Sequence, residues 1–346
     1  MIRYGKPSGA LLEHKTAFFE QNDDLLAENE RIAEIYARQP RREACKNCLH
    51  PLGQKDFTKL GIDCMICSRC GHLNGAHEDT EEFCAAIYTE GDGAAYAKNY
   101  SESDQEAFGK RVKDIYLPKA EFLSDALREL SIPPDETPIT DIGAGSGYFV
   151  AAAREAGFAS VHGFEVSRTQ VDLANKNLGE GSVTLHSLDE IEEIVDGLET
   201  PVVSLIGVLE HLRDPRALLK AVKRNSKVEY LYLSLPLFSM TVMIELLFPK
   251  IMQRHLAGGH THLYTESSID WICGEFGYER VSEWWFGLDL VDLHRTFAVS
   301  LQQVDASGRA TDIWSDKFLA ALDAMQLALD EKRMSSEVHI LLRAPK

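Results

Sequence analysis

The stretch ITDIGAGSGYFV, residues 139–150, decides the fold of this chain. It ends an apolar strand on Gly143, Gly145 and Gly147, which alternate with small residues, and then opens a helix. Glycine lets the backbone come close to a bound molecule and adopt dihedrals that a Cβ forbids, and the start of the helix presents free N–H groups. The pattern therefore predicts a cofactor-binding turn between a buried strand and a helix.

The spacing of the glycines indicates which kind of cofactor the turn binds. A dinucleotide fingerprint, G-x-G-x-x-G, needs its third glycine so that the helix can pack near the sheet with the pyrophosphate at its N-terminus. Tyr148 occupies that third position. The sequence therefore does not predict a bound pyrophosphate. It predicts a cofactor that has no phosphate groups.

Three further strands follow the glycine turn in the order expected of an α/β domain. The second, residues 160–167, carries Glu165 near its end, where a carboxylate can accept hydrogen bonds from both hydroxyls of a ribose. The third, residues 183–187, leads into Leu188 and Asp189. The fourth, residues 202–208, runs directly into the sequence LEHLRDP.

The pattern D-x-G-x-G-x-G at residues 141–147 resembles motif I of the class I methyltransferases that depend on S-adenosylmethionine (SAM), and VLEHLRDP at residues 208–215 resembles their motif IV. The resemblance implies a Rossmann-like α/β core whose seven-stranded mixed sheet has helices on both faces. It also implies SAM as the cofactor. The residues expected to contact SAM lie at the ends of the first four strands: Asp141, Gly143, Ala144, Gly145, Gly147, Glu165, Val166, Ser187, Leu188, Gly207 and Val208.

Two C-x-x-C pairs form the second strong pattern. Cys45 and Cys48 are followed, after eighteen intervening residues, by Cys67 and Cys70. Each pair can form a knuckle, and the two together complete a tetrahedral thiolate site, as in a zinc ribbon. Gly71, directly after Cys70, suits the tight turn of a knuckle. The sequence therefore predicts one structural Zn²⁺ held by these four cysteines.

Other residues near the ribbon leave alternatives for the metal ligands. Cys64 forms a competing C-x-x-C pair with Cys67, although it is interpreted as a packed strand residue. His50, His72 and His77 are also close in sequence, so a histidine ligand stays open. Four thiolates already suffice for a closed site.

Charge and hydropathy restrict the partners and the location. The formal net charge is −18, whereas proteins that track phosphate backbones carry a basic surface. Nucleic acid is therefore not expected as a partner. The longest apolar run, residues 230–248, is interrupted by Pro236 and by polar residues, so no membrane insertion is expected. The N-terminus lacks the apolar core of a signal peptide, and paired C-x-x-C spacing indicates a reducing compartment, so a cytoplasmic location is expected.

The segment GGHTHLYTESS, residues 258–268, is the candidate for chemistry on the methyl acceptor. It follows an insertion after the fifth strand, near the sheet edge where open α/β sheets bind ligands. Histidine can take up a proton near neutral pH. We therefore predict that His262, assisted by His260 or Tyr264, deprotonates or orients the acceptor.

Two alternatives to this prediction remain. In the first, His262 and Tyr264 pack against, or cap, the helix that starts near Thr265, whose Thr-Glu-Ser-Ser run is a good N-terminal signal. In the second, the base is His211, which follows the fourth strand and faces the cofactor site.

The chain is long enough for one large α/β domain with a small module and helical extensions. Acidic residues and tyrosines, including Tyr96 and Tyr100, mark a linker that is expected to cover the cofactor and substrate. The predicted organisation is an N-terminal helical segment at 1–40, the zinc ribbon at 41–78, a helical linker and lid at 79–130, and the methyltransferase core at 131–346 with insertions at 237–260 and 289–333.

The combined architecture resembles the zinc-binding methyltransferases associated with sugar and surface-glycan modification. The chain departs from their sugar C-methyltransferase members in its shorter ribbon and in lacking their long C-terminal domain, so the acceptor atom stays open. The expected function is methyl transfer to a small polar acceptor, such as a sugar, a nucleotide-linked sugar or a glycan precursor. The alternatives are an RNA or protein methyltransferase that docks through the ribbon, and a non-catalytic SAM-binding or partner-binding protein.

Overall fold

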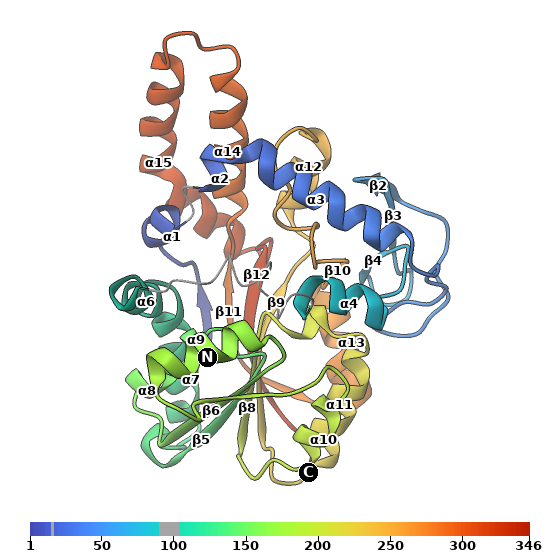
Figure 1. The fold of residues 1–346 in the computed structure, drawn as a ribbon, viewed down its shortest axis with the longest axis vertical. Coiled ribbons are helices and arrows are strands. Elements are labelled where there is room, and N and C mark those ends of the chain that lie inside the picture. The colour runs from blue at the N-terminus through green and yellow to red at the C-terminus, as the bar shows by residue number, and fades with distance from the viewer. Residues whose placement is uncertain (15–16, 90–103) are drawn as a thin grey trace.

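The core of the computed structural model, which describes residues 1–14, 17–89 and 104–346, is an eight-stranded sheet (Figure 1). The strand order is β1-β11-β12-β9-β8-β5-β6-β7, and only β12 runs antiparallel to its neighbours. The strands are β1 (Ile2–Tyr4), β5 (Pro138–Ile142), β6 (Ser160–Glu165), β7 (Val183–Leu185), β8 (Val202–Ile206), β9 (Tyr230–Pro236), β11 (Glu279–Phe286) and β12 (Glu337–Arg343).

Helices cover both faces of this sheet because successive side chains of each buried strand point to opposite faces. On β9, Tyr232 packs with α7 (Leu117–Glu129), α8 (Tyr148–Glu155) and α9 (Arg168–Leu178). Leu231 and Leu233 pack on the other face with α10 (Ile191–Asp196), α11 (Pro215–Arg224) and α13 (Glu266–Phe276). The Rossmann-like α/β class predicted from the sequence is thereby confirmed.

The sequence predicted seven strands, whereas the sheet has eight, because the N-terminus adds β1 to its edge. Its residues pair in parallel with β11, where Arg3 lies opposite Trp284. The Trp284 indole N–H donates to the carbonyl of Gly5 over 2.8 Å. A strand of three residues carries no periodic pattern, so the sequence did not reveal it.

A second, four-stranded sheet forms the ribbon, in the order β10-β4-β3-β2. Its first strands are β2 (Phe57–Lys59), β3 (Ile62–Ile66) and β4 (Leu73–Gly75). The fourth, β10 (His262–Leu263), comes from the core and pairs antiparallel with β4, with His262 opposite Asn74. The ribbon sheet is therefore completed by the segment that the sequence assigned to acceptor chemistry.

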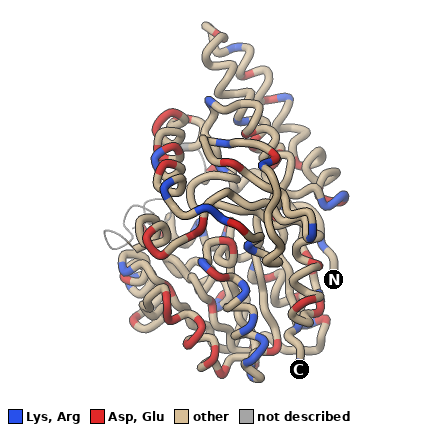
Figure 2. Tube along the Cα trace, turned by 90° about the vertical axis from the view of Figure 1, so that its right-hand side faces the viewer, with Lys and Arg blue, Asp and Glu red and all other residues tan. Residues whose placement is uncertain are grey.

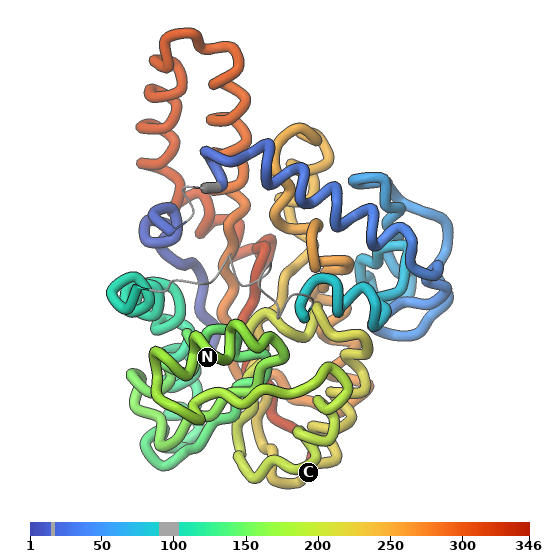
Figure 3. The backbone as a smooth tube through the Cα atoms, in the orientation of Figure 1, coloured from blue at the N-terminus to red at the C-terminus, as the bar shows by residue number. Residues whose placement is uncertain are grey.

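The helical extensions surround these two sheets (Figures 1 and 3). The backbone trace shows α14 and α15 as a hairpin that projects from the core, and α3 crossing toward the ribbon. Residues 90–103 of the predicted linker, with Tyr96 and Tyr100, lie outside the described residues. The remaining elements are α1 (Gly9–His14), α2 (Ala17–Glu20), α3 (Asn22–Ala37), α4 (Glu81–Tyr88), α6 (Gln105–Arg111), the π-helical turn η2 (Val112–Tyr116), η3 (Pro134–Glu136), η4 (Leu209–His211), α12 (Met240–Leu247), α14 (Asp289–Gln302) and α15 (Arg309–Asp330).

Among the described residues, none of the helices is both long enough and apolar enough to cross a membrane.

Candidate functional site

The glycine turn after β5 has the left-handed backbone that its sequence requires. Gly143, Gly145 and Gly147 have φ angles of 70°, 55° and 81°, a region that residues with a Cβ rarely adopt. A Cβ at Gly147 would lie 2.6 Å from a methyl group of Leu178, and one at Gly143 would collide with Val208. The turn is therefore packed directly against the loop that follows β8, which brings the two sequence motifs together.

Glu165 holds the glycine turn to the end of β6. One carboxylate oxygen accepts the N–H of Gly145 over 2.9 Å, and the other accepts the N–H groups of Val166 and Ser167 over 2.8 Å each. A carboxylate has about four lone-pair sites. The three backbone bonds thus leave acceptor capacity for a ribose hydroxyl, so the residue fits both a structural and a cofactor-binding role.

Asp141 lies beneath the turn inside the sheet and is 1% exposed. Burial raises the pKa of its carboxyl group to about 7, an effect that the hydrogen bond from Ser204 opposes and the charge of Glu165 reinforces. The hydroxyl of Ser204 donates to its Oδ1 over 2.7 Å. This hydrogen bond links β8 to β5 beneath the cofactor turn.

The other predicted cofactor residues lie at the same edge of the sheet. The N–H of His186, directly after β7, donates to the carbonyl of Glu165 over 3.0 Å, so Ser187 and Leu188 follow beside the end of β6. Gly207 has a φ of 68° and begins the loop after β8. The candidate SAM residues thus gather at the carboxyl ends of four adjacent strands, where open α/β sheets bind ligands.

Replacing Glu165 with alanine is expected to weaken SAM binding by roughly 1–3 kcal/mol, because hydrogen bonds to a charged group contribute about that much. Calorimetric titration with SAM would measure the change, and Glu180→Ala, at an exposed site beyond α9, serves as the control. Thermal unfolding of both variants without ligand separates lost cofactor contacts from a loosened turn. An unchanged SAM affinity would show that Glu165 only supports the backbone.

The four predicted metal ligands converge in the ribbon. Their sulfur atoms all lie within 4.8 Å of one another. The Sγ atoms of Cys45 and Cys70 are 3.7 Å apart, and those of Cys48 and Cys67 are 3.5 Å apart. Tetrahedral Zn²⁺ with Zn–S bonds of about 2.3 Å requires sulfur separations of about 3.8 Å. The geometry therefore fits zinc held by four thiolates.

The two C-x-x-C pairs form matching knuckles around these sulfur atoms. The N–H of Cys45 donates to the carbonyl of His50 over 2.8 Å, and the N–H of Cys67 donates to that of His72 over 2.9 Å. Gly71 takes a φ of 73° in its knuckle, as its sequence position suggests. Cys64 instead lies on β3 in a small apolar cluster, and it is absent from the four-sulfur group.

His262, predicted as the base, lies inside the ribbon sheet and is 1% exposed. Its Nδ1 is 2.8 Å from Nε2 of His72, while its Nε2 has no hydrogen-bond partner among the described residues. Burial lowers the pKa of His262 well below the usual value. Tyr264 is equally buried, and its hydroxyl also lacks a partner within the described part of the chain.

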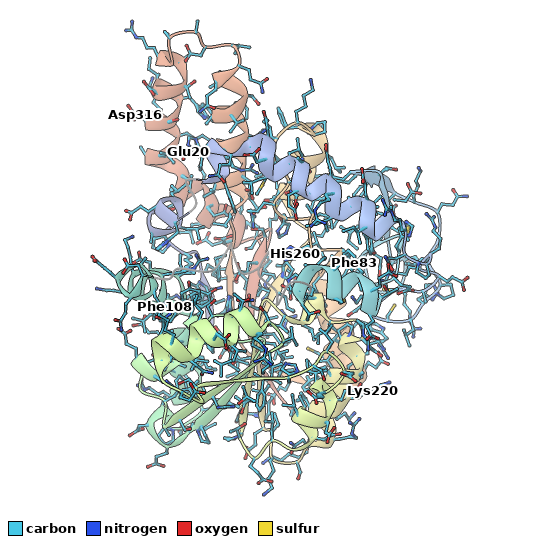
Figure 4. All side chains as sticks on the ribbon, in the orientation of Figure 1. Glu20, Phe83, Phe108, Lys220, His260 and Asp316 are labelled. Carbon is cyan, nitrogen blue, oxygen red and sulfur yellow. The ribbon has the colours of Figure 1, made fainter. Side chains whose placement is uncertain are left out.

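A different group of side chains meets at the loop that follows β8: Glu210, His211 and His260. Figure 4 labels His260, which lies near α4. The Nε2 atoms of His211 and His260 lie 3.8 and 4.0 Å from the same oxygen, Oε1 of Glu210. That oxygen would be 3.7 Å from a Cβ placed on Gly207, which ties the group to the predicted cofactor loop. We call these three residues the Glu-His-His cluster.

The cluster was only partly visible in the sequence. His211 and His260 were candidates, but Glu210 was not among the predicted site residues, although its position in the fourth-strand motif signalled a place near the cofactor. Tyr88 of α4 is one of the tyrosines of the predicted linker and lid, but it was not among the predicted site residues. Its hydroxyl lies 2.8 Å from Nδ1 of His211, a contact across 123 residues of chain for which no local pattern exists.

Buried ion pairs lock the ribbon onto the segment that carries His260. Asp79 receives hydrogen bonds from Lys46, from Arg42 over 3.0 Å, and from the hydroxyl of Thr261 over 2.7 Å. Lys59 pairs over 3.0 Å with Glu245, another buried carboxylate. The ribbon is thus bound to the segment that carries His260 by buried polar contacts.

Comparison with known proteins finds a family match in the central part of the chain. Residues 116–283 match the family described as Methyltransferase domain. This part of the chain is similar to a methyltransferase domain. A comparison with curated proteins gave no significant match.

Solved structures with similar folds include other methyltransferases. Magnesium protoporphyrin IX methyltransferase from Synechocystis PCC 6803 has 13% identity and a TM-score of 0.46, covering 77% of this chain and 100% of its own. The plantazolicin methyltransferase BpumL has 12% identity and a TM-score of 0.46, covering 76% and 94%. A SAM-dependent methyltransferase from Archaeoglobus fulgidus has 15% identity and a TM-score of 0.37, covering 65% and 94%.

Proposed function

We propose that this methyltransferase transfers the methyl group of SAM to a small polar acceptor, with a sugar, a nucleotide-linked sugar or a glycan precursor as the leading class. The observation that carries the proposal is the Glu-His-His cluster at the loop after β8, which contains the predicted cofactor residue Gly207. SAM supplies an electrophilic methyl group, which an acceptor must approach in line from a distance of about 3 Å. Hydrogen-bonding groups on the acceptor side of the turn therefore suit a hydroxylated molecule.

The protonation states of the cluster support contact with polar acceptor groups. Burial lowers the pKa of His211 to about 3 and that of His260 to about 4, so both imidazoles are neutral at physiological pH. A neutral imidazole has a nitrogen lone pair that accepts a hydrogen bond, or a proton, from a hydroxyl group. The side chains of His211 and His260 remain 14% and 25% exposed, so a small molecule can reach them.

The charges of the ribbon disfavour the alternative in which it docks RNA. Arg42, Lys46 and Lys59 are buried, and each pairs with a carboxylate inside the protein. The exposed Lys55 pairs with Asp63 over 3.0 Å. A phosphate backbone requires accessible basic side chains. Figure 2 likewise shows acidic and basic residues interspersed along the trace.

The proposed role of the ribbon is structural. Cys45, Cys48, Cys67 and Cys70 would hold one Zn²⁺ in a closed site, which leaves no open position for chemistry. Both Asn47 and Asn74 donate to a cysteine sulfur over 3.6 Å, an arrangement that suits negatively charged thiolates. The ion would thereby stabilise the ribbon sheet, which includes β10 and supports the Glu-His-His cluster.

A methyl-transfer screen tests the proposed function. The full chain, supplied with SAM, would be incubated with nucleotide sugars and glycan precursors, with short RNAs and with peptides, and the products would be read by mass spectrometry. We expect a methylated sugar-containing product. Methylation confined to RNA or peptide would overturn the acceptor class, and SAM binding without any product across all three sets would favour the non-catalytic alternative.

A further inference from the structure

The Glu-His-His cluster has a geometry that hydrogen bonds do not explain. The Nε2 atoms of both histidines face Oε1 of Glu210 at 3.8 and 4.0 Å. These distances are too long for hydrogen bonds, which lie below about 3.2 Å for nitrogen donors. One ligand atom from each of the three residues nevertheless lies within 4.8 Å of the other two. The three donors therefore surround a common point without bonding to one another.

The contacts on the far side of each ring allow both Nε2 atoms to act as lone-pair donors. Nδ1 of His260 donates to the carbonyl of His255 over 2.8 Å, which places the proton on Nδ1. Nδ1 of His211 lies 3.3 Å from the carbonyl of Gly259, which can only accept, and 2.8 Å from the hydroxyl of Tyr88. This tautomer presents a bare Nε2 of His260 toward Glu210, and His211 adopts the same tautomer when its Nδ1 donates to the hydroxyl of Tyr88.

Glu210 contributes a buried carboxylate with unused capacity. Its side chain is 3% exposed, and its Oε2 has no hydrogen-bond partner among the described residues. A buried carboxylate oxygen without a partner is costly, and nitrogen lone pairs directed at the carboxylate add repulsion. A single proton could bond to only one of the two facing nitrogens, whereas a cation can satisfy all three donors.

We propose that Glu210, His211 and His260 bind one divalent first-row metal ion, separate from the four-cysteine site. Two imidazole nitrogens and a carboxylate oxygen form a donor set that suits ions such as Zn²⁺, Co²⁺ or Fe²⁺. Metal-binding histidines typically donate their second ring N–H to a carbonyl or carboxylate. His260 has such a partner in the carbonyl of His255, and Nδ1 of His211 lies 2.8 Å from the hydroxyl of Tyr88 and 3.3 Å from the carbonyl of Gly259.

The surrounding protein also holds these ligands in place. The N–H groups of Arg254 and His255 donate to Glu245 over 2.7 and 2.6 Å. Nε2 of His255 donates to the carbonyl of Leu237 over 2.6 Å. The carbonyl that orients His260 is therefore fixed from two directions, as expected of residues behind a metal ligand.

Three protein ligands leave positions open on such an ion. This part of the inference rests on the proposed function: adjacent hydroxyl groups of a sugar-like acceptor would fill those positions and be oriented toward the cofactor turn.

Titration of the full, zinc-loaded chain with Co²⁺ tests the metal site without SAM or acceptor. We expect one equivalent to bind, with weak visible bands typical of nitrogen and oxygen ligands and with the ribbon zinc retained by elemental analysis. Glu210→Gln and His260→Ala should each weaken Co²⁺ binding by about tenfold or more. His294→Asn, which replaces a buried histidine of α14 outside the cluster, should bind Co²⁺ as the wild type does.

Several outcomes would overturn the site. These are the absence of Co²⁺ binding by the wild type, an intense thiolate-to-cobalt band with displacement of zinc, and wild-type binding by Glu210→Gln. Thermal unfolding of each variant shows whether it is folded, and the two cluster variants provide independent readings. Co²⁺ binding with no product in the acceptor screen would count against the proposed function alone. Full methyl transfer by metal-stripped, zinc-ribbon-intact protein would count against the role of the ion in orienting the acceptor.

Discussion

Replacing Cys67 with serine is expected to reduce the zinc content by one ion per chain, the ion held by the ribbon, and to unfold the ribbon. Structural zinc sites contribute apparent binding free energies of about 10–16 kcal/mol in small zinc peptides. That is comparable with the whole net stability of a typical domain, roughly 5–15 kcal/mol. Elemental analysis would give the zinc content, and thermal unfolding would show an early transition.

The matched control is Cys64→Ser. Cys64 lies on β3 in an apolar cluster with Leu73 and Val242, so its replacement should cost packing but keep the zinc. The reverse result, with zinc kept in Cys67→Ser and lost in Cys64→Ser, would make Cys64 the fourth ligand. Because β10 joins the ribbon to the core, we expect unfolding of the ribbon also to disturb the cluster around His260.

The second large effect is expected from His260→Ala, which should lower kcat by about 10²–10⁴, the usual contribution of a positioned acid-base or orienting group. The affinity for SAM should stay near that of the wild type, because Nε2 of His260 faces Glu210 rather than the glycine turn. Initial rates with an acceptor from the screen and calorimetry with SAM measure the two quantities separately.

His262→Ala is the informative comparison for this variant. His262 is packed against His72 and Tyr264 in the ribbon sheet, so its loss should lower the melting temperature together with the activity. A loss of kcat as large as that of His260→Ala, at an unchanged melting temperature, would instead support His262 as the base. Retention of more than about a third of the rate by His260→Ala would be too small a loss for a group that orients or deprotonates the acceptor.

Local patterns in the sequence predicted the parts of the fold that depend on neighbouring residues. The glycine turn and the strand carrying Glu165 lie where the pattern of apolar and turn residues indicates. Thr265 caps α13 with a reciprocal capping box, as its Thr-Glu-Ser-Ser run suggested. Each of these features is determined within a few residues of chain.

The cluster depends instead on residues that are distant in sequence. Glu210 and His211 follow β8, whereas His260 reaches them through a loop fixed by Glu245 and Lys59. The two-residue strand β10 is too short to show an alternating pattern. The sequence could therefore name histidines near the acceptor, but it could not tell His260, which meets Glu210, from His262, which joins the ribbon.

The closure of the ribbon sheet by β10 sets an order of events during synthesis. His72 and His262, which meet in that sheet, are separated by 190 residues. At about 5–20 residues per second, the ribosome needs roughly 10–40 s to deliver the missing edge strand after β4 has been made. Through that interval the nascent ribbon carries an unpaired strand edge, a known starting point for misassembly. A shortened chain that stops before residue 262 would keep that edge permanently, so the ribbon cannot be detached as a self-sufficient module.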